Sequence, residues 1–154
     1  MSNTTHAQST VRPQRALHLV DLENLAATPW MSEQVAQRAA AWYLAAAEYT
    51  EGDLVVVATS HRNGFAASMA FPGATVRCRS GRNGADLALL DAYDEFNPGR
   101  FSRLVVGSGD GIFTGLVAAA RRTGLDVTVV TRRRAGSATL RAAASSVALL
   151  GEAA

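Results

Sequence analysis

The sequence predicts an α/β protein, a three-layer sandwich in which helices cover both faces of a mostly parallel central sheet of about five strands. Two observations predict it. Short aliphatic runs alternate along the chain with segments whose apolar residues recur at helical spacing. The 154 residues are 48% hydrophobic and 18% charged, the size and composition of one globular domain. We therefore expect a single domain over residues 15–150, preceded by a flexible polar tail over residues 1–14.

Five runs predict the strands, and they cover residues 17–20, 54–58, 75–79, 104–106 and 127–130. The run 54–58 is aliphatic throughout, as in strands buried on both faces. The run 75–79 alternates Val76 and Cys78 with arginines, which is typical of an edge strand. Because strands and helices alternate, right-handed crossovers and parallel pairing are expected.

Helical spacing of apolar residues fills the gaps between these strands. The first helix, marked by Val35 to Tyr49, is expected to start near Thr28-Pro29 and to end at Gly52. The same spacing predicts helices over residues 64–70 and 86–96, one from Phe113 that Gly124 closes, and a last helix from Ser137 to Leu150. His18, inside the first strand, and Trp42 and Tyr43, at helical spacing, are interpreted as core residues.

The composition excludes several function classes. All 15 basic residues are arginines, so mechanisms that need a lysine amine, such as Walker-type loops, Schiff-base enzymes and receiver domains, are excluded. The single cysteine, Cys78, excludes an internal disulfide and a cysteine-based zinc cluster, and is interpreted as a small buried residue. No run reaches the roughly 18 apolar residues of a membrane span. We expect a soluble, cytoplasmic protein without a membrane partner.

Three aspartates fall where the predicted strands end. Asp21 closes the first strand, Asp110 follows the fourth, and Asp86 opens a helix whose preceding strand ends at the same edge. In open α/β sheets, ligands bind beyond the carboxyl ends of the strands. Neighbouring carboxylates repel one another unless a cation neutralises them, and oxygen ligands suit Mg²⁺ or Mn²⁺. The sequence therefore predicts a metal site formed by Asp21, Asp86 and Asp110.

Four of the acidic residues also have an interpretation in which they do not bind a metal. Asp86 alone fits a helix N-cap or first-turn carboxylate, and Asp110 alone fits a turn or cap between two glycines. Glu23 is either a water-positioning group or a solvent-facing carboxylate. Asp91 lies about 140° around the helix from Asp86, so it is expected to support the site from outside or to face solvent. Ser108, with Glu23 and Asp91, is counted among the residues that surround the proposed ligands.

Three short motifs, taken in order, are Asp21-x-x-Asn24, Gly84-Ala85-Asp86-x-x-Leu89 and Ser108-Gly109-Asp110-Gly111-x-Phe113. Together they resemble the NYN branch of the PIN-like ribonucleases, over about residues 16–150. The resemblance implies a PIN-like, Rossmannoid fold and a metal-dependent ribonuclease. It implies Asp21, Asp86 and Asp110 as metal ligands, with Asn24 beside them in the catalytic site.

One position departs from the family pattern. Two places after the aspartate matched to Asp110, the family usually carries a second acidic residue, and this chain has Ile112. The alternative function is therefore an RNA-binding or regulatory module that kept the fold and lost turnover.

Polar and basic residues at the same edge predict contacts with RNA phosphates, because arginine forks suit phosphate oxygens. The candidates are Ser60, His61 and Arg62 after the second strand, Arg82 before the third helix, and Arg132, Arg133 and Arg134 after the fifth strand. A solvated loop explains an arginine run equally well. The expected partner is RNA, single-stranded or structured, and a homodimer is left open.

Overall fold

The computed structural model describes residues 14–151, so the flexible tail expected over residues 1–14 lies outside the described residues, except for Gln14. Within this range one parallel sheet runs through the molecule in the order β3-β2-β1-β4-β5-β6. Its strands are β1 (Ala16–Asp21), β2 (Leu54–Thr59), β3 (Thr75–Cys78), β4 (Arg103–Gly107), β5 (Asp126–Thr131) and β6 (Ser146–Leu149). The α/β class and the parallel sheet are confirmed, with six strands described rather than about five.

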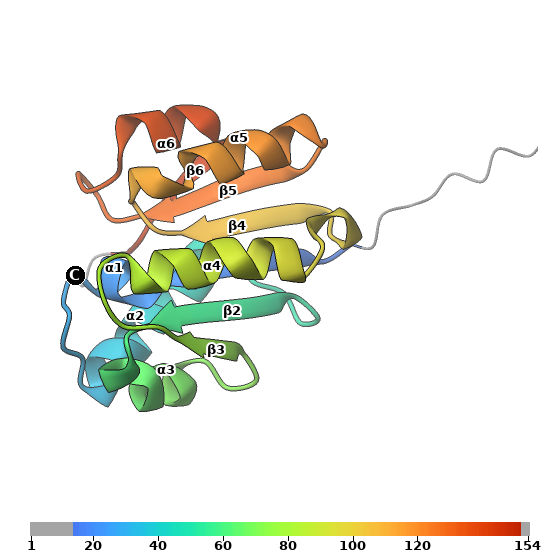
Figure 1. The fold of residues 1–154 in the computed structure, drawn as a ribbon. Coiled ribbons are helices and arrows are strands. Elements are labelled where there is room, and N and C mark those ends of the chain that lie inside the picture. The colour runs from blue at the N-terminus through green and yellow to red at the C-terminus, as the bar shows by residue number, and fades with distance from the viewer. Residues whose placement is uncertain (1–13, 152–154) are drawn as a thin grey trace, which may run out of the picture.

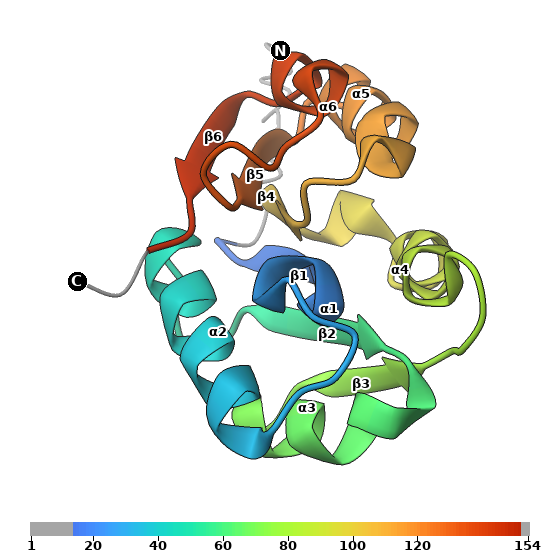
Figure 2. The ribbon, with the colours of Figure 1, turned by 90° about the vertical axis from the view of Figure 1, so that its left-hand side faces the viewer.

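Helices cover both faces of the sheet, as Figure 1 shows from the side. They are α1 (Leu22–Ala26), α2 (Glu33–Ala46), α3 (Gly64–Ala70), α4 (Gly84–Glu95), α5 (Thr114–Arg122) and α6 (Ala138–Ala143). Short 3₁₀ turns are η1 (His61–Asn63), η2 (Pro98–Arg100) and η3 (Gly111–Phe113). Figure 2, which looks onto the carboxyl ends of the strands, shows α2 and α3 on one face and α4, α5 and α6 on the other.

Alternation along the strands divides the apolar residues between two cores. Val20 and Val57 pack on the α2 face, where Tyr43 is completely buried. Their neighbours Leu19 and Val56 pack on the opposite face, against helices α4 and α5. The inner strands β2, β1, β4 and β5 therefore bury residues on both faces, which explains the continuous aliphatic runs in the sequence.

The carboxyl end of the sequence folds differently from the expected helix up to Leu150. Helix α6 does begin after Ser137, whose hydroxyl accepts a hydrogen bond from the Leu140 amide. It ends at Ala143, and β6 then pairs in parallel with β5. The Ser145 amide donates to the Val127 carbonyl at 2.8 Å, which directs the chain to the open edge of β5. Alanine periodicity signals a helix but carries no information on this long-range pairing.

The first helical region also starts and ends at different residues than expected. A short helix, α1, which the periodicity did not predict, directly follows β1, and Thr28 and Pro29 lie in the loop after it. Ser32 caps α2 instead, because its hydroxyl accepts a hydrogen bond from the Val35 amide at 3.2 Å. Helix α2 ends at Ala46, before the predicted end at Gly52.

The core assignments of single residues are mostly confirmed. His18 is buried, and its ring nitrogens lie 2.9 Å from the Tyr43 hydroxyl and 3.0 Å from an Asp53 carboxylate oxygen. Trp42 is half-buried against the α2 core. The prediction that Cys78 is buried is wrong, because this residue is exposed. Cys78 ends β3, an edge strand that pairs with a neighbouring strand, β2, on one side only. No helix among residues 14–151 combines the length and apolar character needed to cross a bilayer.

Candidate active site

Asp21 and Asp86 meet at the carboxyl edge of the sheet. Asp21 is the last residue of β1, and Asp86 lies in the first turn of α4, which packs on β1 and β2. Both side chains are buried, at 5% and 6% exposure. The two carboxyl groups interact by a hydrogen bond and by charge, and each shifts the pKa of the other. This contact joins two segments that are 65 residues apart in the sequence.

The electrostatics of the pair follow from this geometry. Burial raises the pKa of Asp21 to about 8, together with the hydrogen bond and the negative charge of Asp86. Burial also raises the pKa of Asp86, and the charge of Asp110 adds to this effect. None of the ion pairs between described residues involves Asp21 or Asp86. The pair is thus a buried acidic site that lacks a compensating positive side chain.

Asp110 lies close enough to act on Asp86 by its charge, but it already has a structural role. It follows β4, and its Oδ1 accepts a hydrogen bond from the Ile112 amide at 2.9 Å, capping η3. The interpretation of Asp110 as a cap residue is therefore correct as far as Oδ1 is concerned. Asp86 is a first-turn residue of α4, which is the second of the two structural alternatives expected for it, and Asn83 occupies the N-cap position.

Asn24 braces the turn after β1 against the turn after β4. Its side-chain oxygen accepts a hydrogen bond from the Gly109 amide at 2.9 Å, and its own amide donates to Asp21 at 3.3 Å. Ser108 adds a second brace, because its hydroxyl donates to Asp21 at 3.3 Å and accepts from the Asp110 amide at 3.1 Å. The first and third motifs of the sequence are therefore physically joined through Asn24 and Ser108.

Glu23 is neither free in solvent nor buried. Its Oε1 accepts hydrogen bonds from the Thr59 hydroxyl, from the amide and hydroxyl of Ser60, and from the side-chain amide of Asn63. Burial alone would raise the pKa of Glu23, but these hydrogen bonds outweigh it and hold the pKa below its usual value. Neither interpretation made from the sequence included this role, in which Glu23 ties α1 to the segment after β2.

A cleft of about 240 Å³ opens over these residues. It is lined by Asp21, Glu23, Asn24, Ser60 and Asp86, with Arg79 and the loop of residues 81–85 on its far side. Asp110 is not part of this lining. The loop approaches closely at Gly84, where a Cβ atom would lie 2.3 Å from the Arg79 carbonyl oxygen. A glycine is therefore required for α4 to start where it does and to bring Asp86 to Asp21.

The sequence model of the NYN domain matches residues 12–150, nearly the whole chain. This chain belongs to the NYN domain family. The NYN domain falls within the PIN-like nuclease superfamily, so the resemblance drawn from the three motifs is confirmed. A search of curated proteins finds no significant match.

A solved structure supports the fold. A protein of unknown function from Vibrio parahaemolyticus superposes with a TM-score of 0.69 at 20% sequence identity. The match covers 92% of this chain and 95% of that one. At this identity the likeness concerns the fold alone.

The acidic residues of this NYN domain are its candidate ligands for a metal ion. Among residues 14–151, no three His, Cys, Asp or Glu side chains converge closely enough to hold one. The donors present nonetheless have suitable chemistry, because two buried carboxyls that interact directly and lack a positive partner offer the oxygen ligands that a hard cation prefers. Asp21 and Asp86 therefore fit a divalent cation as a pair of ligands, and Asp110 has its Oδ2 free of any described hydrogen bond.

The predicted phosphate-binding residues of the NYN domain lie in different environments. Ser60 lines the cleft, and His61 is exposed and contacts Ser80 of the opposing loop at 2.8 Å. One donor of the Arg132 side chain is already used, since its Nε donates a hydrogen bond to the Asn24 carbonyl at 3.1 Å. The remaining candidates, Arg62, Arg82, Arg133 and Arg134, are exposed. Asp91 is also exposed and pairs with Arg79 at 3.3 Å, which agrees with its expected place outside the proposed ligands.

One site residue was missed from the sequence. Asn63, which is buried, donates hydrogen bonds to Glu23 and to the loop before α2. Asn63 lies three residues after Ser60, which the sequence did single out, so its position after β2 was the available signal. Arg79, which the sequence offered as a weaker candidate for phosphate binding, lines the cleft.

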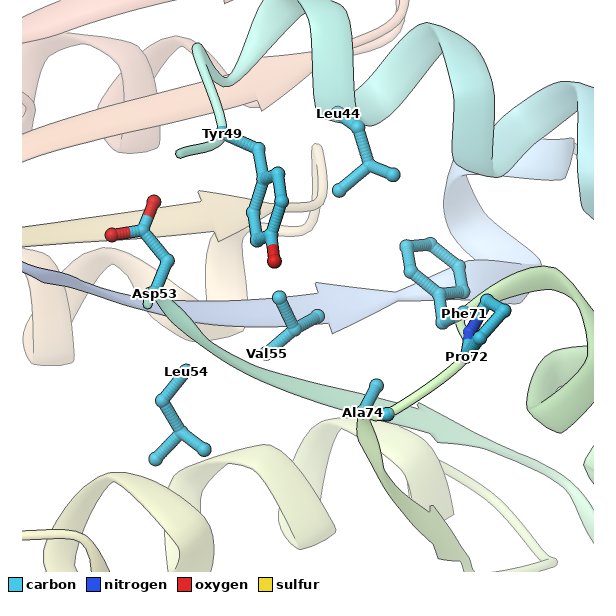
Figure 3. Close-up of a pocket in the computed structure, with 9 residues that line it drawn as sticks. Leu44, Tyr49, Asp53, Leu54, Val55, Phe71, Pro72 and Ala74 are labelled. Atoms are coloured by element: carbon cyan, nitrogen blue, oxygen red, sulfur yellow. The ribbon is translucent and has the colours of Figure 1, made fainter. Parts of the chain in front are cut away.

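A second cavity of about 210 Å³ lies at the opposite, amino edge of the sheet (Figure 3). Figure 3 shows Leu44, Tyr49 and Phe71 on the α2 side of β2, with Asp53 at the start of that strand. The Asp53 carboxylate is fully used by the amides of Ala16 and Thr50 and by His18. This cavity is therefore framed by structural contacts and lies away from the aspartate pair.

Proposed function

We propose that this NYN domain is a metal-dependent ribonuclease, which hydrolyses RNA phosphodiester bonds with Mg²⁺ or Mn²⁺ held by Asp21, Asp86 and Asp110. The observation that carries the proposal is the buried contact between Asp21 and Asp86, without a positive partner, in a cleft at the carboxyl edge of the sheet. Retaining two buried carboxyls side by side costs stability, so a ligand that requires them is the simplest explanation. The family supports the same chemistry.

The protein's own residues would hold and orient the reactants. Asp21 and Asp86 are the proposed inner ligands, and Asp110 approaches with its free oxygen. Asn24 and Ser108 keep Asp21 and the Gly109 turn at fixed positions. When bound, a divalent cation supplies charge neutralisation at the scissile phosphate and acidifies the attacking water. A covalent protein nucleophile is not required for this reaction.

The cations around the cleft would bind the RNA backbone. His61 and Arg62 follow β2, Arg82 lies beside the cleft loop, and Arg132, Arg133 and Arg134 follow β5. Arginine side chains suit the paired oxygens of a phosphate, and the exposed ones are free to reach it. Arg132 is proposed mainly to orient the turn at Asn24, because its Nε is already bonded there.

The test is incubation of labelled single-stranded RNA with the purified protein in Mn²⁺, Mg²⁺ or a chelator. Metal-dependent products are expected from the wild type. Asp110→Asn should lower their rate more than about a hundredfold while preserving the cap of η3, since an asparagine oxygen can still accept from Ile112. Asp126→Asn is the matched control, because Asp126 is exposed at the amino edge of the sheet. Undiminished cleavage by Asp110→Asn would contradict the proposal.

A second candidate function is an RNA-binding or regulatory module without turnover. One reason is Ile112, which packs against the α4 and α5 core at a position where the family pattern usually has an acidic residue. The other is that no three potential metal ligands converge among residues 14–151. This candidate predicts RNA binding that weakens steeply with salt, because phosphate contacts release counterions. Bound RNA without products in every metal would favour it, whereas cleavage would exclude it.

A further inference from the structure

Trp30 stands out on the surface of the molecule. It lies in the loop between α1 and α2 with 70% of its surface exposed. A single exposed apolar residue is ordinary, so exposure alone indicates nothing. The guanidinium of Arg62, however, lies over the indole ring at 3.9 Å from its centroid. One face of the ring is therefore covered by a cation while the side chain remains open to solvent.

The backbone that carries Trp30 is fixed on both sides of the residue. The Thr28 hydroxyl donates to the Trp30 carbonyl at 2.9 Å and accepts from the Trp30 amide at 3.2 Å. The side-chain amide of Asn63 donates to the Pro29 carbonyl at 3.0 Å, and its oxygen accepts from the Met31 amide at 3.2 Å. The two hydrogen bonds of Asn63 clamp the backbone on either side of Trp30, and because Asn63 is buried, this clamp is shielded from water. The indole is thus presented by an ordered loop, and little entropy remains to be lost when a ligand binds.

The same clamp connects Trp30 to the proposed catalytic cleft. Asn63 also donates a hydrogen bond to Glu23 at 2.7 Å, and Glu23 lines the cleft together with Asp21 and Asp86. Arg62 and Asn63 belong to the same η1 turn, directly after β2. The loop that carries Trp30 is therefore joined to the lining of the cleft through Asn63 and Glu23.

We propose that Trp30, backed by Arg62, is a stacking platform for an unpaired RNA base next to the scissile phosphate. The inference rests on the proposed function because it takes RNA as the ligand. It adds that the RNA is single-stranded next to the scissile phosphate. Aromatic rings bind unpaired bases through their π faces irrespective of base identity, and an arginine on the other face strengthens the contact. Bases inside a duplex are already stacked on each other and do not offer a free face.

The charge around Trp30 favours RNA over an apolar protein partner. Arg62 and the neighbouring His61 are exposed basic residues, and both follow the strand that ends at the cleft. Phe65 and Met69 of the following helix α3 are also exposed, so the test below separates RNA from a second copy of this chain. An aromatic ring with an arginine on one face matches a nucleic-acid backbone with splayed bases.

The test measures binding of a labelled ten-nucleotide single-stranded RNA in chelator, where turnover is absent, by fluorescence anisotropy. Trp30→Ala should weaken binding about 5- to 150-fold, and Trp30→Phe should restore most of the affinity. Binding of an RNA duplex or of an abasic oligonucleotide should change little in the same variants. Val147→Ala, at a position 40% exposed on the edge strand β6, should bind as the wild type does. Thermal melting verifies that each variant is folded.

Intrinsic fluorescence adds a readout that a purely structural role would not produce. The chain has two tryptophans, Trp30 and Trp42. A base stacked on Trp30 should quench the emission of the wild type, and this quenching should disappear in Trp30→Phe while the RNA stays bound. Since Trp42 is half-buried against the core, its emission is the internal reference.

Several results would overturn the inference. Equal single-strand affinity of Trp30→Ala and wild type would exclude the platform, even if the wild type cleaves RNA. An equal loss of duplex binding would exclude selection of unpaired bases, and loss of self-association in light scattering would assign Trp30 to a second copy. Trp30-dependent binding without cleavage in any metal would instead reject only the ribonuclease. Absence of all RNA binding at low salt would reject both.

Discussion

The side-chain oxygen of Asn24 accepts a hydrogen bond from the Gly109 amide at 2.9 Å, which joins the turn after β1 to the turn after β4. The two residues are 85 positions apart in the sequence. This bond holds the strand end that carries Asp21 next to the turn that carries Asp110. The geometry of the proposed site thus depends on a neutral residue as well as on its carboxylates.

Asn24→Ala should therefore impair activity more than stability. Loss of one hydrogen bond of this kind costs about 0.5–1.5 kcal/mol of the free energy of unfolding. Cleavage should fall by about 10- to 100-fold, because the groups that orient metal ligands have effects of this size. Urea unfolding and a cleavage assay measure the two quantities, and Gln37→Ala, at an exposed position of α2, is the control. Wild-type cleavage by Asn24→Ala would contradict the bracing role.

Divalent cations should stabilise the folded protein through the aspartate pair. A ligand that binds only the native state at a hundred times its Kd adds about 2.7 kcal/mol to the free energy of unfolding. We expect Mn²⁺ or Mg²⁺ to raise the melting temperature of the wild type, and to have little effect on Asp21→Asn or Asp86→Asn. Asp126→Asn should respond to the metal as the wild type does, since it lies at the other edge of the sheet. Identical shifts in all four proteins would show that the cation binds elsewhere.

Glu23 should contribute to stability through the donors that it satisfies. Four hydrogen bonds converge on its Oε1, from Thr59, Ser60 and Asn63. Glu23→Ala leaves these donors without their acceptor, and such a loss costs about 1–3 kcal/mol. Glu23→Gln keeps an acceptor oxygen but removes the charge, so a smaller loss is expected. Chemical denaturation of both variants tests this order, and equal stability of wild type and Glu23→Ala would refute it.

His18 should contribute less to the stability of the fold at mildly acidic pH. Burial lowers the pKa of His18 below its usual value, against the opposing effect of its hydrogen bond with Asp53. A histidine with a lowered folded-state pKa contributes stability above its unfolded pKa of about 6.5, and this contribution is lost as the pH falls through the folded value. Asp21, whose pKa is raised to about 8, has the opposite effect in the same range, so the contribution of His18 is measured as a difference between two proteins.

His18→Gln provides the comparison, since glutamine does not titrate in this range. We expect it to be less stable than the wild type at neutral pH, because the contacts with Tyr43 and Asp53 are disturbed. The difference in unfolding free energy between the wild type and His18→Gln should nevertheless become smaller from pH 7.5 to pH 5.5. The same pH dependence in both proteins would assign the acid sensitivity to other groups. Asp53, whose pKa is lowered despite its burial, acts only at more acidic pH.

The sequence by itself determined the sheet and the approximate place of the site. Runs such as residues 54–58 are aliphatic because central parallel strands bury both faces, and this property is local. Since parallel strands end at one edge, placing Asp21, Asp86 and Asp110 at this edge required only parallel pairing.

Only the tertiary structure decided which side chains touch. Residues 146–149 form a strand because β5 offers an open edge, although their alanine-rich surroundings favour a helix. Glu23 and Asn63 become partners because α1 and η1 meet above the sheet, and Trp30 is fixed there by the same contact. These contacts depend on how loops from separate crossovers come together in space. The spacing of apolar residues along a single segment carries no record of that arrangement.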